Sequence, residues 1–106
     1  MAITFFDGRA TVASGGTAVQ VSTSSVPFTK VTITAETDNT GIITVGASTV
    51  VASLATRRGA PLSAGDSVTI EAKGQEHGNL TNLYIDTTVN GDGVTFVGQS
   101  ETHPNA

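Results

Sequence analysis

The sequence predicts an all-β fold: one antiparallel β-sandwich or jelly-roll-like domain with an extended N-terminal arm. Apolar side chains occupy every second position in Lys30–Glu36 and Ser67–Glu71, which is the pattern of strands with one buried face. Glycine and proline between the apolar runs indicate short turns, and no run has a convincing helical period. A chain of 106 residues has room for one domain and is large enough to fold without metal or crosslinks.

The composition excludes several classes of site. The chain has no cysteine, which rules out disulfides, zinc–thiolate sites and a thiol nucleophile. Its net charge is −4, and five Lys and Arg residues are spread over the whole chain. Nucleic-acid binding needs clustered cations, so no nucleic-acid partner is expected. The opening Met1–Asp7 has no basic segment, and its apolar run is too short for a signal or a membrane span.

Three regions are expected along the chain. Residues 1–16 are predicted to form the arm, because Asp7-Gly8 and Gly15-Gly16 are turn or hinge signals around a short Ala10–Ala13 run that could add to a sheet edge. Residues 17–98 are predicted to form the sandwich, and the polar residues 99–106 a flexible tail.

The parity of the apolar runs predicts which side chains face the core. In each run every second side chain is apolar and the side chains between them are polar, as in an antiparallel sheet with one solvated face. The predicted core consists of Val19, Val21, Val31, Ile33, Ile43, Val45, Val68, Ile70, Leu83, Ile85, Val94 and Phe96.

Two segments need separate interpretation. Ala47–Leu54 suits either an edge strand or a helical turn, and its Ser, Thr and Val residues favour the strand. Asn90-Gly91 is a hairpin signal, because both residue types tolerate the positive φ of a type I′ turn. We therefore expect a hairpin that joins a strand ending near Val89 to Val94–Val97.

No catalytic, cofactor or metal site is expected. His77 and His103 lie far apart in the sequence, whereas a metal site needs three or four convergent donors. Asp86 and Asp92 lack the ligand spacing of a calcium loop, so turn chemistry explains them better. Ser63 lies in no nucleophile-elbow context. The protein is predicted not to be an enzyme.

Four residues are candidates for binding a partner. Phe5 and Phe6 are adjacent and cannot both face one core in an extended chain. At least one of them could anchor a partner, and the alternative is an end strand folded onto its own sandwich. Arg57 and Arg58 lie in an expected loop, where they could either pair with an acidic partner surface or only add solubility.

The order of turns and strands from about residue 17 to 98 resembles small β-sandwich virion proteins of tailed bacteriophages, most closely capsid decoration (cement) proteins. The resemblance implies a non-enzymatic protein on the capsid surface of the virion. Its expected partners are the major capsid protein and copies of itself, as a dimer or trimer, with no membrane partner. A neck, tail or fibre-associated adhesion or receptor-binding module is the alternative. The resemblance rests on Thr17–Gln20, Val31–Ile33, Asn39–Gly41 with Val45-Gly46, Pro61-Leu62 with Gly65–Val68, Leu83–Asp86, and Gly91–Val94.

Overall fold

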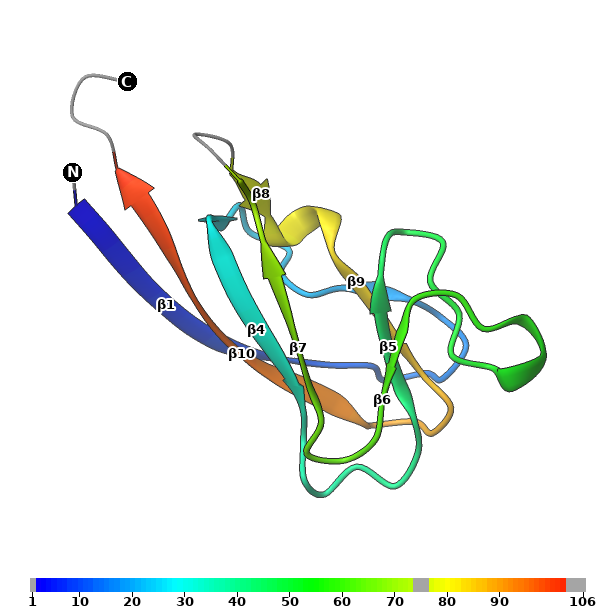
Figure 1. Cartoon of the computed structure of the whole chain (residues 1–106). Coiled ribbons are helices and arrows are strands. Elements are labelled where there is room, and N and C mark those ends of the chain that lie inside the picture. Colours follow the sequence, from blue (N-terminus) through cyan, green and yellow to red (C-terminus); the bar gives the residue numbers. More distant parts are fainter. Residues whose placement is uncertain (1, 74–76, 103–106) are drawn as a thin grey trace.

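A computed structural model describes residues 2–73 and 77–102, and it confirms the all-β prediction. Two four-stranded antiparallel sheets form a sandwich, and a small third sheet pairs β3 with β8 (Figure 1). The first sheet has the order β1 (Ala2–Thr11), β10 (Gly93–Thr102), β4 (Lys30–Ala35) and β7 (Ser67–Glu71). The second has the order β2 (Val19–Gln20), β9 (Tyr84–Thr87), β5 (Ile43–Gly46) and β6 (Ala60–Leu62). The remaining elements are β3 (Pro27–Phe28), β8 (Gly78–Asn79) and the 3₁₀ turns η1 (Leu54–Thr56) and η2 (Leu80–Asn82).

The core lies between the inner faces of the two large sheets. All twelve side chains predicted from parity belong to it: eight are buried, and Val19, Val68, Ile70 and Leu83 are half-buried against the others. Strand alternation was therefore sufficient to find the inner faces. Four further buried members come from short or irregular segments without alternation, namely Val12, Phe28, Leu62 and Leu80.

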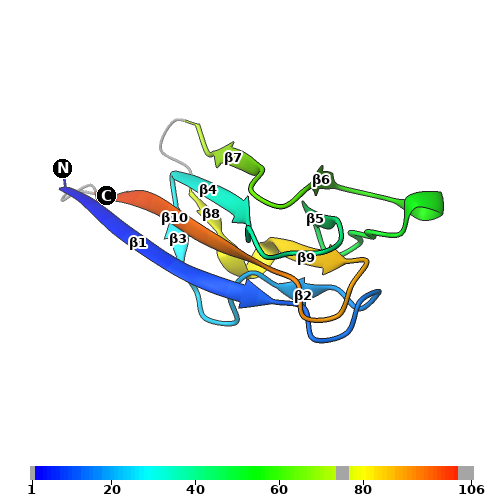
Figure 2. The same cartoon turned by 90° about the horizontal axis from the view of Figure 1, so that it is seen from below.

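The N-terminal residues differ from the expected arm. Ala2–Thr11 is an uninterrupted strand that pairs with β10 at ten consecutive positions, and the following residue, Val12, is fully buried. The pairing of β1 with β10 extends beyond the sandwich at one end only. Ala2–Thr4 and Ser100–Thr102 pair with each other beyond the end of β4, and they project as a two-stranded ribbon (Figures 1 and 2).

Two reciprocal pairs of phenylalanine and glycine hold β1 against β10. Phe6 lies opposite Gly98, and Phe96 lies opposite Gly8. A Cβ at Gly8 would lie 2.5 Å from Cζ of Phe96, and a Cβ at Gly98 would lie 2.5 Å from Cζ of Phe6. The two rings also contact each other, with centroids 6.3 Å apart. Gly8, which the sequence indicated as a turn, is therefore a strand residue that leaves room for an aromatic ring.

The predicted tail also begins as a strand. Gln99–Thr102 is the last part of β10, and Gln99 pairs with Phe5 on one side and Lys30 on the other. Residues 103–106 lie outside the described part of the chain. The polar composition of residues 99–102 misled the prediction, because a strand at a sheet end pairs through its backbone and needs no apolar side chain.

The expected Asn90-Gly91 hairpin is wrong. β9 pairs with β2 and β5, whereas β10 pairs with β1 and β4, so the turn crosses from the second sheet to the first. Gly91 has a φ of +91°, but Asn90 does not have a positive φ, and a type I′ turn requires both. Hydrogen bonds to residues that follow β1 hold this turn in place. Gly91 N–H donates to the carbonyl of Val12 (2.8 Å), and Gly15 N–H donates to Asn90 Oδ1 (2.6 Å).

The strand favoured for Ala47–Leu54 is also wrong. The segment contains a turn and one isolated bridge between Val51 and Arg58, and it leads into η1. Val50 and Ala52 are buried, whereas Leu54 is 80% exposed. Strand propensity failed here because burial of single side chains against the second sheet determines the path of this segment.

We expect substitution of the two adjacent phenylalanines in β1 to have very unequal effects on stability. Phe6→Ala removes a ring that covers Gly98 and contacts Phe96, and it should lower the free energy of unfolding by about 2 to 4 kcal/mol. Phe5 is 71% exposed, so Phe5→Ala should change the free energy by about 0.5 kcal/mol or less. Urea unfolding of both variants measures the difference, and equal destabilisation would contradict the assigned faces of β1.

Candidate partner-binding surface

The centre of the outer face of the second sheet is covered by its own chain. Thr44 and Asp86 are paired across β5 and β9 and alternate with core residues, yet both are almost fully buried. The segment from β5 to β6 lies over them: Ala52 N–H donates to Asp86 Oδ2 at 2.9 Å, and Ala52 itself is buried. The centre of this face is therefore closed to a partner, whereas Pro61 on its edge strand β6 is exposed.

Two buried carboxylates hold the loops over and beside the second sheet. Asp86, 1% exposed, accepts hydrogen bonds from the backbone N–H groups of Gly16 (2.9 Å) and Ala52 (2.9 Å). Asp92 accepts from the N–H groups of Thr40 (3.2 Å) and Gly41 (2.8 Å). Backbone N–H groups thus compensate the desolvation of both carboxylates. Asp92 lies at a turn, as predicted, whereas Asp86 lies within β9 and joins two loops to the sheet.

The outer face of the first sheet is open. It carries the odd-numbered side chains of β1 and, up to Gln99, of β10, among them three exposed apolar residues: Ile3 (50% exposed), Phe5 (71%) and Val97 (55%). Phe5 and Val97 lie one row apart on neighbouring strands. Around them is an open hollow of about 210 Å³, lined by Phe5, Lys30, Thr32, Val97, Gly98 and Gln99. We refer to Ile3, Phe5 and Val97 as the apolar patch.

Hydroxyl groups cover the rest of this face and bond to one another. Thr32 Oγ1 lies 3.0 Å from Thr69 Oγ1, and Thr34 Oγ1 lies 2.8 Å from Ser67 Oγ. These bonds run between β4 and β7, so the hydroxyls already have a partner when the face is free. Covering the face with another protein would therefore leave fewer unsatisfied polar groups than covering a face of unpaired hydroxyls.

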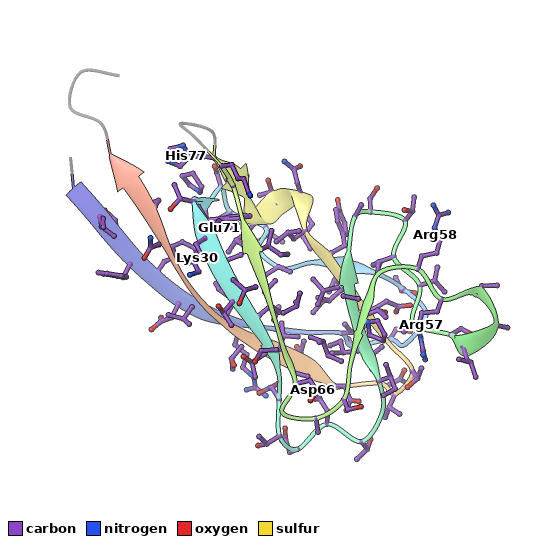
Figure 3. The ribbon with its side chains drawn as sticks, viewed as in Figure 1. Lys30, Arg57, Arg58, Asp66, Glu71 and His77 are labelled. Atoms are coloured by element: carbon purple, nitrogen blue, oxygen red, sulfur yellow. The ribbon has the colours of Figure 1, made fainter. Side chains whose placement is uncertain are left out.

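Charged side chains lie at the margins of the face. Lys30 and Glu71 are opposite one another on β4 and β7, at the end near Phe5 (Figure 3). Towards the other end, Arg9 Nε contacts Glu36 Oε2 at 2.9 Å. Asp7 lies opposite Val97, and Lys30 lines the same hollow as Phe5 and Val97, so charged side chains border the apolar patch directly. Apolar side chains bordered by charged ones are common in protein-binding surfaces.

The structure separates the four predicted partner-binding residues. Phe5 lies on the outer face, whereas Phe6 is half-buried and packs on the core. Arg57 and Arg58 lie at the opposite end of the molecule, which is 47 Å in its longest dimension (Figures 1 and 3). Arg57 Nε donates to the carbonyl of Ala52 (3.0 Å) and braces its own loop, while Arg58 is exposed.

Sequence reasoning missed two members of the apolar patch. Val97 lies in the run Val94–Val97, where Val94 and Phe96 take the inward parity, so Val97 must point outward. That signal was present in the sequence. Ile3 could not be assigned to a face without knowing that β1 is a strand in register with β10.

The remaining sequence candidates do not assemble into a chemical site. Within residues 2–73 and 77–102, no three of the Asp, Glu and His residues come together as possible ligands of one metal ion. His77 is exposed, and His103 lies outside the described residues. Ser63 forms part of a turn, in which its N–H donates to Asp66 Oδ2 at 3.1 Å. The described part of the chain also contains no helix that is long and apolar enough to cross a bilayer.

Comparison of the chain with models of protein families, with curated proteins and with solved structures found no match. The apolar patch and the open face around it are the geometric features from which a function can be argued.

We expect Asp86 to be required for stability. In Asp86→Ala the N–H groups of Gly16 and Ala52 lose their acceptor in a buried place, which should cost about 2 to 4 kcal/mol of unfolding free energy. Asp38 is exposed in a turn, so Asp38→Ala is the matched control and should cost about 0.5 kcal/mol or less. Denaturant unfolding compares the two, and a stable Asp86→Ala variant would contradict the role of Asp86 in holding the loops.

Proposed function

We propose that this protein is a non-enzymatic structural component of a tailed-phage virion, and that it binds the outer surface of the assembled head and stabilises it. The observation that carries the proposal is the difference between the two outer faces. The centre of one is covered by the chain itself, and the other presents the apolar patch on a hydroxyl-rich sheet. The resemblance of the strand pattern to capsid decoration proteins supports the choice of partner.

The energetics favour the apolar patch as the centre of the contact. Phe5 and Val97 border the same hollow, and covering such side chains gains about 25 cal/mol for each Å² of apolar surface removed from water. A rigid aromatic side chain loses little conformational entropy on binding, and aromatic residues are common among those that dominate binding energy. The β1–β10 pairing holds Phe5 on a regular strand, so its position is fixed before binding.

Stabilisation of the head requires no chemistry on the part of this protein. A protein that binds the assembled lattice more tightly than it binds separated capsid subunits shifts the equilibrium towards the lattice. The contribution of one copy is small, but many copies on one shell add up. The major capsid protein is therefore the proposed partner, and the capsid surface is the proposed location.

We expect substitution of the apolar patch to weaken binding without unfolding the protein. The double variant Phe5→Thr/Val97→Thr keeps β-forming residues on the strands and should bind particles that lack this protein at least about tenfold more weakly. Leu54→Thr is the matched control, because Leu54 is 80% exposed and belongs to η1, which lies at the opposite end of the molecule from the N-terminal part of β1 (Figure 1). Co-sedimentation with particles measures binding, and circular dichroism checks the fold.

The same particles test the role in stability. Particles without the protein should assemble but release DNA at a lower temperature, and adding back the wild-type protein should restore them, whereas adding the double variant should not. Equal binding by the double variant would contradict the proposed surface. If particles without the protein were fully stable but failed to adsorb to cells, the head-stabilising function would be wrong and an adhesion function would replace it.

A further inference from the structure

The outer edge of β1 is long, regular and unpaired. β1 ends the first sheet, with β10 on one side and, among residues 2–73 and 77–102, no strand on the other. Its ten residues contain neither proline nor lysine, and its register with β10 has no bulge. Proteins usually protect exposed edges with such features, because an open row of N–H and C=O groups is a template for another strand.

The other edges of the two large sheets lack this combination of length and openness. β7, at the far side of the first sheet, has five residues and ends at Glu71. β6 has three residues, one of which is Pro61, and β2 has two residues. Within the described part of the chain, β1 is therefore the edge best suited to pair with another strand.

The hydrogen bonds of Val12, the residue after β1, show which residues of β1 point their backbone N–H and C=O groups to the open edge. Val12 N–H donates to the carbonyl of Asp92 (2.9 Å), and the carbonyl of Val12 accepts from Gly91 N–H (2.8 Å). Backbone groups alternate in direction along a strand, so the even-numbered residues face β10. Phe5, Asp7, Arg9 and Thr11 direct their N–H and C=O groups to the open edge. An open hollow of about 410 Å³ lies beside this edge, between Gly8–Thr11 and Val19–Thr23.

We propose that two copies of this chain form a dimer by pairing their β1 strands antiparallel, about a twofold axis at Gly8. The two first sheets then join into one continuous sheet. This pairing goes beyond the binding of a capsid and does not depend on it.

The charges of β1 select this register. With the axis at Gly8, Asp7 of each copy lies opposite Arg9 of its partner, so two opposite-charge pairs form. An axis at Asp7 or at Arg9 would place like charges opposite each other. An axis at Phe5 or at Phe6 would leave Asp7 opposite an apolar side chain. Asp7 is exposed. In the free chain Arg9 Nε contacts Glu36, which follows β4 on the far side of β10, so the guanidinium group must turn from Glu36 towards the open edge to pair with Asp7 of the other copy.

The dimer would present both apolar patches to the same side. A twofold axis perpendicular to the sheet keeps the outer faces of both copies on one surface. Two copies that bind one shell together gain from multivalency, because the second contact is made at a high effective concentration. A dimer of this geometry therefore suits the proposed function, although it can exist without it.

A proline at an outward-facing position provides the most specific test. Asp7→Pro removes an N–H that points to the open edge and leaves the bonds to β10 in place, as proline does on natural edge strands. Asp7→Ser is the matched control, since it removes the charge but keeps the N–H. Sedimentation velocity of the purified full chain, over a range of concentrations and without particles, should give twice the 10.7 kDa chain mass for the wild type and Asp7→Ser. Asp7→Pro should sediment as a monomer.

Charge reversal tests the register. Asp7→Arg should weaken dimerisation at least about tenfold, because each Arg9 then faces a like charge, and the double variant Asp7→Arg/Arg9→Asp should recover it. A monomeric wild type, or a dimeric Asp7→Pro with an intact fold by circular dichroism, would overturn the proposal. If Asp7→Pro is monomeric but the charge variants behave as the wild type, the Gly8-centred dimer is also wrong.

Discussion

The pairing of β1 with β10 is the constraint on which the rest of the structure depends. It pairs β1 with β10, the first and last strands of the described chain, at ten consecutive positions. Residues near both ends of the sequence therefore lie side by side in the first sheet. The reciprocal Phe6–Gly98 and Phe96–Gly8 pairs fix its register, because a shift by one residue would place each ring against a residue with a side chain. The same register sends Phe6 into the core and Phe5 to the outer face.

The second constraint is the buried carboxylate of Asp86. By accepting from Gly16 and Ala52, it holds one loop from each side against the second sheet, and the buried Val50 and Ala52 belong to the segment that lies there. The centre of the second sheet's outer face is thus covered by the chain itself, while the outer face of the first sheet stays open. A side chain far from the apolar patch therefore contributes to the difference between the two outer faces.

The sequence was sufficient for the fold class and for the core, because both depend on local alternation. The sequence was insufficient for those segments whose structure depends on pairing with strands far away in the chain. Gly8 has the local signature of a turn, and only the ring of Phe96 on the opposite strand explains it as a strand residue. Asn90-Gly91 has the local signature of a hairpin, but the strands on either side belong to different sheets. Of the candidate site, Phe5 was predicted, Val97 could have been predicted from parity, and Ile3 could not. The role of Arg57 in binding a partner stays a prediction, and its bond to the Ala52 carbonyl could not be predicted because it depends on the path of the loop.

The orientation of this protein on an assembled phage head is the most direct test of the account. An electron-microscopy reconstruction of intact particles, at a resolution that separates strands, would show which surface meets the shell. We predict that the sheet of β1, β10, β4 and β7 faces the capsid subunits, with Phe5 and Val97 at the contact. A contact made through the second sheet or through the Leu54 end of the molecule, or the absence of the protein from the shell, would contradict the account.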